Sequence, residues 1–128
     1  MSDLRAFYEA YNAVCNRHDF SALRPFVHQR LVVNGEPRTL EEYAADLGRV
    51  VDAFPDYTWT IQRLVVEEPW LSVHLADRGT HRGPWLGQAP SGRSVTTDEF
   101  AMYRITQGRI AEIWVTADNW RLLHPDHD

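Results

Sequence analysis

Three side chains in the second half of the chain could carry acid–base chemistry: Asp118, His81 and Glu99. Asp118 follows an alanine and stands two positions before a tryptophan, so we expect an apolar neighbourhood. Such surroundings desolvate a carboxyl group and raise its pKa toward neutrality, as removal of a proton next to a carbonyl requires. The alternative is an Asx turn or a cap at a strand end, because Asp-Asn is common there.

His81 stands in a short segment bounded by two glycines, beside the expected mouth of a pocket. There it could hold a substrate carbonyl or stabilise an enolate oxygen. Lone histidines in such loops are more often hydrogen-bonded structural residues or simply exposed. Both interpretations stay open from the residue types.

Glu99 falls in a segment of strand character, on the face that it shares with Tyr103. A carboxylate in this place could act as a second acid–base group, with Tyr103 in the pocket wall. The alternative is a buried ion pair with Arg78 or Arg104.

The last expected strand has two alternating faces. One carries Glu112, Trp114, Thr116 and Asp118, and the other carries Ile113, Val115 and Ala117. We expect the first face to line an interior pocket and the second to contact a partner subunit in a homodimer. Trp114 would then be a pocket wall, with core packing as its alternative. For Glu112 an ion pair with an arginine competes with catalysis.

Further substrate-binding candidates come from earlier segments. Asn34 ends an early strand, where its amide could reach the pocket floor, although Asn34-Gly35 is also a strong turn dipeptide. Tyr11 and Tyr57 are amphipathic wall candidates, with core packing as the alternative for Tyr11. Trp85, in the Gly- and Pro-rich loop, is a further candidate.

Composition bounds the class of protein. The 128 residues make one domain, 1–128, of ordinary globular composition. A net charge of −5 argues against a nucleic-acid partner, and no apolar run approaches the ~18 residues of a membrane span. The thirteen cations are all arginine, so no lysine can form a Schiff base. The N-terminus, Met1 to Arg5, lacks the basic-then-apolar layout of a signal peptide, so we expect a cytoplasmic protein.

We also expect no cofactor and no metal. The histidines lack ligand spacing, and no P-loop, dinucleotide fingerprint or CxxC is present. The single cysteine, Cys15, lies in an apolar helical pattern, which favours a buried structural thiol over a nucleophile.

The elements that must position these groups are helices first and strands afterwards, an α+β arrangement. Apolar spacing predicts helices over 3–17 and 40–53, the second with a capping box at Thr39 and Glu42, and a short helical turn near Phe20. Strand patterns cover 26–34, 57–66, 70–79, 93–106 and 109–117, and the last two form a hairpin around Gln107-Gly108. Gly35-Glu36-Pro37 is expected to break the first strand.

Three motifs in this order carry a family resemblance. They are Gly79-Thr80-His81-Arg82-Gly83, Pro90-Ser91-Gly92-Arg93, and Gly108 to Trp114 followed by Asp118. As a set they resemble the GTHxG, PxGR and GRIxExWxxxD elements of the SnoaL-like polyketide cyclase and ester cyclase group of the NTF2-like superfamily. The resemblance implies a cone built from a strongly bent antiparallel sheet packed on N-terminal helices.

The resemblance also implies an activity. In that group the aspartate that closes ExWxxxD, here Asp118, is the general acid/base of an intramolecular aldol ring closure on a hydrophobic polyketide. His81 or Asn34 would hold the enolate, and no cofactor would take part. Homodimers are a further expectation.

Other activities of the same fold stay open. Epoxide hydrolases of this fold use an Asp-Arg-Asp arrangement around one water; the chain offers Asp118 and Arg104 but no second inward aspartate, because Asp98 points opposite to Glu99. Cofactor-independent hydroxylation cannot be separated from cyclisation by sequence. A non-catalytic binding module is the alternative outside enzymes.

Overall fold

The computed structural model describes residues 3–117, and its two helices begin where their caps predict. Helix α1, Leu4–Asn16, is capped by Asp3, whose Oδ1 accepts a hydrogen bond from the Ala6 amide at 3.0 Å. Helix α2, Leu40–Ala53, has the capping box in which Thr39 and Glu42 bond each other's backbone amides. A short 3-10 turn, Phe20–Ala22, follows α1.

Six strands form one sheet in the order β2-β1-β6-β5-β4-β3. Their bounds are β1 Val27–Val33, β2 Glu36–Thr39, β3 Thr58–Glu67, β4 Trp70–Thr80, β5 Ser94–Thr106 and β6 Arg109–Ala117. The α+β architecture is confirmed. The sheet is mixed rather than wholly antiparallel, because β1 runs parallel to β6. No short turn joins these two strands, so nothing local dictates their relative direction.

The expected break after the first strand is instead a hairpin. Asn34 and Gly35 both have positive φ, 51° and 84°, as a two-residue turn with the twist of a sheet requires. The chain then returns along β1 as β2, where Pro37 lies opposite Val32. Proline is tolerated there because β2 is the edge strand of the sheet.

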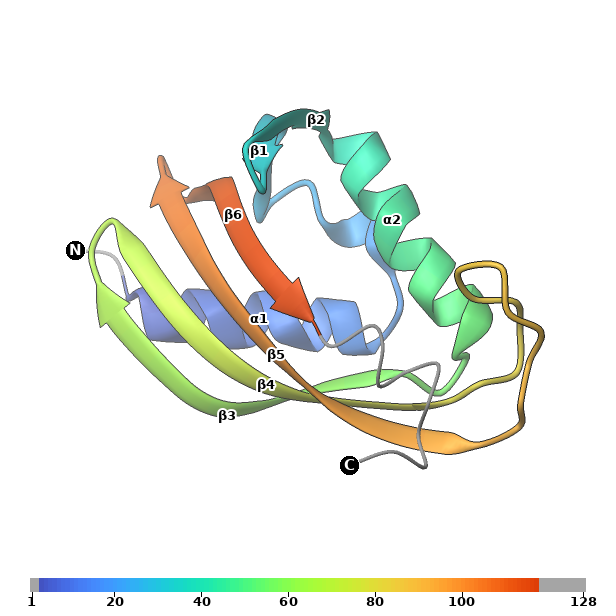
Figure 1. Cartoon of the computed structure of the whole chain (residues 1–128). Coiled ribbons are helices and arrows are strands. Elements are labelled where there is room, and N and C mark those ends of the chain that lie inside the picture. Colours follow the sequence, from blue (N-terminus) through green and yellow to red (C-terminus); the bar gives the residue numbers. More distant parts are fainter. Residues whose placement is uncertain (1–2, 118–128) are drawn as a thin grey trace.

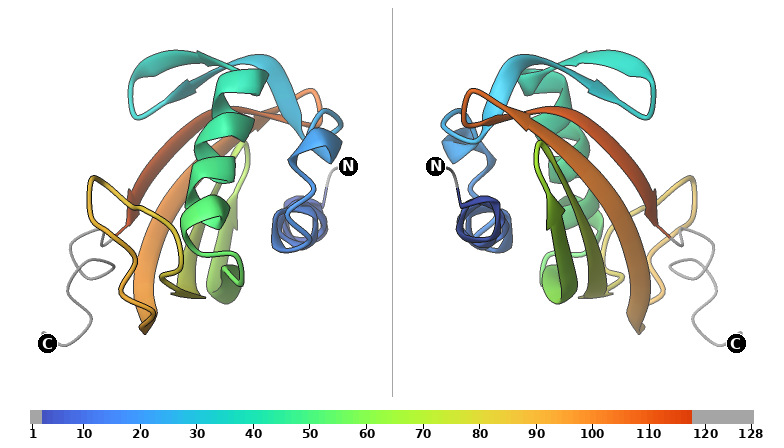
Figure 2. Two further views of the ribbon diagram at one scale, coloured as in Figure 1. Left: turned by 90° about the vertical axis from the view of Figure 1, so that its right-hand side faces the viewer. Right: turned by 90° about the vertical axis from the view of Figure 1, so that its left-hand side faces the viewer.

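Both helices pack on the concave side of the bent sheet (Figures 1 and 2). Register irregularities between Ile61 and Arg63 in β3, and between Arg104 and Ile105 in β5, fall within the two long hairpins. Bulges of this kind increase local twist and bend a strand. The resulting hollow holds the hydrophobic core and, toward α2, the candidate site.

The register of the last hairpin corrects the expected faces of β6. Ile113 pairs with Tyr103 and is 1% exposed, whereas Trp114 pairs with Met102 and is 46% exposed. Opposed residues share a face of the sheet, so Ile113 follows Tyr103 to the concave side. Glu112, Trp114 and Thr116 therefore lie on the outer face, the reverse of the expected assignment.

Candidate active site

A cavity of about 680 Å³ lies between α2 and the concave face of the sheet. Five aromatic side chains form much of its wall: Tyr43, Tyr57, Trp59, Trp85 and Tyr103. The aliphatic wall comes from Val33, Leu47, Val50, Ile113 and Val115. Its size and lining are typical of small-molecule sites. Of the sequence candidates, the structure brings Tyr57, Trp85, Glu99 and Tyr103 together here.

Tyrosine hydroxyls line the inner end of this cavity. A smaller void of about 30 Å³ lies there, and Tyr43, Trp59, Glu99 and Tyr103 border both spaces. The Tyr11 and Tyr43 hydroxyls are hydrogen-bonded, and the Tyr8 and Tyr103 hydroxyls are 3.5 Å apart. Burial raises the pKa of all four phenols well above the ordinary value. They therefore stay neutral and can donate hydrogen bonds.

Glu99 brings a carboxyl group into the cavity wall from β5. Its neighbour behind the wall is Asp77 of β4, which is fully buried. The Tyr57 hydroxyl donates a hydrogen bond to Asp77 Oδ2 at 3.1 Å. Burial first, and then the neighbouring Glu99 carboxyl group, raise the pKa of Asp77 well above its ordinary range.

Asp77 is the site residue that sequence reasoning missed. The signal was present in β4, where Leu71, Val73 and Leu75 alternate toward the concave face and Asp77 continues the same row. A carboxyl in an otherwise apolar row is unusual, because a buried charge must be neutralised or paired.

His81 does not line the cavity. Its ring stacks on Phe54, with centroids 5.1 Å apart, and its Nδ1 accepts a 3.4 Å hydrogen bond from the Ser91 amide. The side chain is 2% exposed, and its Nε2 has no hydrogen-bond partner among the described residues. These contacts are those of a packing residue under the loop, and its catalytic role stays a prediction.

The glycines that flank His81 have a steric reason. A Cβ on Gly79 would lie 2.9 Å from side-chain atoms of Phe54 and Tyr57, and one on Gly83 would lie 2.6 Å from the Asp52 carbonyl oxygen. Both contacts are closer than carbon and oxygen atoms tolerate. The Gly79–Gly83 motif therefore packs the end of α2 against the end of β4.

Three substrate-binding candidates lie away from the cavity. The Asn34 side chain binds the backbone of β6 through two hydrogen bonds. Its Oδ1 accepts from the Val115 amide at 2.8 Å, and its Nδ2 donates to the Val115 carbonyl oxygen at 3.2 Å. Trp114 and Arg104 both donate to Glu112, at 2.6 and 3.0 Å. The Trp114 and Arg104 hydrogen bonds lower the Glu112 pKa. The ion pair considered for Glu112 is thus present, on the outer face.

Tyr11 contacts only the inner void, and its core-packing alternative holds, since it is 3% exposed. Cys15 is likewise buried, and burial raises the pKa of its thiol to about 12, which suits a structural residue. Asp118 lies outside the described residues, so its assignment stays a prediction.

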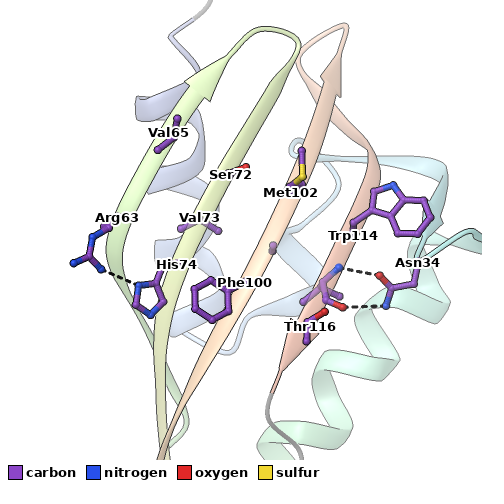
Figure 3. A pocket seen from close by; sticks show the side chains of 12 residues that line it. Asn34, Arg63, Val65, Ser72, Val73, His74, Phe100, Met102, Trp114 and Thr116 are labelled. Carbon is purple, nitrogen blue, oxygen red and sulfur yellow. Dashed lines mark hydrogen bonds between the residues drawn. The ribbon is translucent and has the colours of Figure 1, made fainter.

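The outer face of the sheet carries a second hollow, of about 480 Å³ (Figure 3). Val65, Phe100, Met102 and Trp114 stand on it with exposed fractions of 64%, 54%, 45% and 46%. His74 stacks on Phe100, its Nδ1 accepts a 3.1 Å hydrogen bond from Arg63, and its Nε2 lies 2.8 Å from Asp98 Oδ1. We call this surface the outer apolar face.

The geometry defines a class: a small α+β cone with an aromatic cavity on its concave side and a carboxyl group in the cavity wall. The family model of the SnoaL-like polyketide cyclases matches residues 5–124. The chain belongs to this family of the NTF2-like superfamily. No protein with a curated description matches it.

Solved structures agree with this assignment. A SnoaL-like polyketide cyclase from Agrobacterium tumefaciens is 26% identical, with 98% of each chain covered and a TM-score of 0.87. IdmH from Streptomyces antibioticus is 25% identical over 96% of this chain and 97% of its own, with a TM-score of 0.86. TsrD from Streptomyces laurentii is 24% identical over 97% and 96%, with a TM-score of 0.87, and shows the fold alone.

Among residues 3–117, no three or more His, Cys, Asp or Glu side chains are grouped so that they could hold a metal ion. Within the same stretch, no helix combines the length and the apolar character that crossing a bilayer needs.

Proposed function

We propose that the chain is a cofactor-independent cyclase that closes a ring in a hydrophobic, polyketide-like substrate by acid–base catalysis. The observation that carries the proposal is the Glu99 carboxyl group set in the wall of an aromatic cavity, in a chain of the SnoaL-like family. An apolar site of this size favours a flat, unsaturated substrate, since aromatic walls pack against flat surfaces.

The reaction needs one base and several hydrogen-bond donors. A carboxylate removes a proton from the carbon next to a carbonyl, and the enolate carbon then attacks a second carbonyl of the same molecule. The carboxylic acid returns its proton to the new alkoxide, so the catalyst ends as it began. Asp118 is the proposed base, with Glu99 as the second acid–base group. A contact of His81 with the enolate stays a prediction, since its ring stacks on Phe54 and does not line the cavity.

The neutral phenols of Tyr43 and Tyr103 border the cavity and are the proposed donors to the enolate oxygen, whereas the Tyr57 hydroxyl already donates to Asp77. They replace Asn34, whose amide is committed to the Val115 backbone. An Asp-Arg-Asp water site built on Arg104 is disfavoured, because this guanidinium pairs with Glu112 on the outer face.

Two isosteric substitutions test the proposal: Asp118→Asn and Glu99→Gln. Each amide keeps the shape of the acid but cannot exchange its proton, so we expect turnover of a linear poly-β-keto ester to fall by a factor on the order of 10² to 10⁴. Asp98→Asn is the matched control, because Asp98 is on the same strand as Glu99 but faces outward. Stable variants with normal turnover would exclude acid–base roles for both residues.

A further inference from the structure

Two carboxyl groups meet where the cavity joins the sheet. Asp77 of β4 pairs in register with Thr97, and Glu99 of β5 pairs with Leu75, so the two acids are diagonal neighbours on the concave face. Asp77 is 0% exposed, whereas Glu99 is partly exposed and lines the cavity. One member of the pair is therefore sealed from solvent and the other is open to a ligand.

The hydrogen bonds of Asp77 do not suit a buried negative charge. One phenol, that of Tyr57, donates to Oδ2, and Oδ1 has no hydrogen-bond partner among the described residues. A buried carboxylate with a single neutral donor is unstable, because desolvation penalises the charged form. A proton on Asp77 removes this penalty and supplies an O–H that can be donated to Glu99.

The groups packed around the pair do not neutralise it either. Helix α1 contributes Tyr8, Tyr11 and Cys15, helix α2 contributes Tyr43, and β5 adds Tyr103; burial raises the pKa of each, so all stay neutral. The charged groups that act most on Asp77 are themselves carboxylates, those of Glu99 and, from the outer face, Asp98. Two adjacent acids without a cation are stable when they hold one proton between them.

We propose that Asp77 and Glu99 share a single proton at neutral pH, which resides on Asp77 while the negative charge resides on Glu99 at the cavity wall. Asp77 is then a positioning residue. Its O–H donates to the Glu99 carboxylate and holds that group charged and oriented toward a bound molecule. Proton uptake from a substrate gives two neutral acids, and release of one proton restores the pair.

The catalytic use of this charge rests on the proposed function. The sharing of the proton does not, because it is a property of the free protein and can be measured without substrate. The 128-residue chain, labelled with ¹³C at the Asp and Glu carboxyl carbons, allows the Asp77 carboxyl group to be titrated by NMR between about pH 4 and pH 11. Asp77→Asn and Glu99→Gln assign the two resonances.

We expect the Asp77 resonance to remain that of a protonated acid at neutral pH. Glu99→Gln removes the like charge, so the midpoint of Asp77 should fall by about one pH unit or more.

Asp98→Asn is the control for any change of charge on β5, and it should shift the midpoint of Asp77 much less than Glu99→Gln does. The proposal would be overturned if Asp77 ionised in the ordinary acidic range, or if its titration midpoint were the same in Glu99→Gln as in the parent chain. Titrations as expected, with normal turnover in Glu99→Gln, would overturn the catalytic role of Glu99 and leave the shared proton standing.

Discussion

At the scale of single residues, Asp77 binds a proton more tightly in the folded chain than in the unfolded one, because burial and Glu99 both raise its pKa. The folded state then holds more protons than the unfolded state between the ordinary carboxyl pKa and the raised one. Over that interval the free energy of unfolding falls as pH rises, by at most about 1.4 kcal/mol per pH unit for one proton.

Asp77→Asn should remove this dependence while keeping an acceptor for the Tyr57 hydroxyl. The melting temperature of the variant, relative to the parent chain, is expected to increase steadily from about pH 5 to pH 8. Thermal unfolding followed by circular dichroism at several pH values measures the difference. Asp98→Asn, an exposed acid on the outer face, should follow the parent curve. Parallel curves for Asp77→Asn and the parent would show that Asp77 ionises normally.

At the scale of elements, the two helices, the strands β3 and β4 and the β5–β6 hairpin could be predicted because their signals are local. Caps, apolar spacing and a Gln107-Gly108 turn lie within a few residues of the structure they specify. The pairing of β1 with β6 could not be predicted, since it brings together residues such as Asn34 and Val115 that lie 81 positions apart in the sequence. Period-2 alternation likewise identified the two rows of β6 but not which row faces inward.

The dependence on pairing between distant residues also explains which residues of the candidate site could be predicted. Tyr57, Trp85, Glu99 and Tyr103 were predicted because they lie on strands or loops whose inward face local pattern reveals. Asn34, Trp114 and Arg104 were misplaced because their positions depend on the register of β6 against β1 and β5. Tertiary pairing, rather than residue type, decides on which side of the sheet these groups act.

Docking of α2 onto β4 gives a test at this scale. Gly79→Ala should lower the free energy of unfolding by about 1–3 kcal/mol, because the added methyl group overlaps Phe54 and Tyr57. Gly48→Ala is the matched control: it lies inside α2 with open space around its Cβ position, and should stabilise the chain by about 0.5–1 kcal/mol. Chemical denaturation measures both. Equal effects of the two substitutions on the free energy of unfolding would mean that the contacts with Phe54 and Tyr57 do not restrict the side chain at position 79.

At the scale of the whole molecule, we propose that the chain forms a homodimer through the outer apolar face. The expected interface row of Ile113, Val115 and Ala117 is corrected, because Ile113 and Val115 line the cavity instead. The apolar groups that face outward are Val65, Phe100, Met102 and Trp114. Arg63 and Asp98 flank them with opposite charges, so two copies related by a twofold axis can complement each other.

Light scattering should therefore give about twice the 14.8 kDa mass of one chain. Phe100→Glu places a charge at the centre of the outer apolar face and should yield monomers. Leu86→Glu changes an equally exposed apolar residue, 59% exposed, in the loop at the cavity mouth, and should leave the dimer intact. A monomeric parent chain at micromolar concentration would refute this interface.

The parallel pairing of β1 with β6 also has a consequence for how the chain reaches its native state. Contacts between distant residues must overcome the entropy of closing a long loop before they contribute any stability, so a fold of high contact order forms slowly. During synthesis α1 and the β1–β2 hairpin emerge first, and they lack their central neighbour until the last strand has left the ribosome. The cavity, whose wall includes Val33 of β1 and Val115 of β6, is completed only by that final strand. Nascent chains shorter than this would expose the concave core to chaperones and to aggregation.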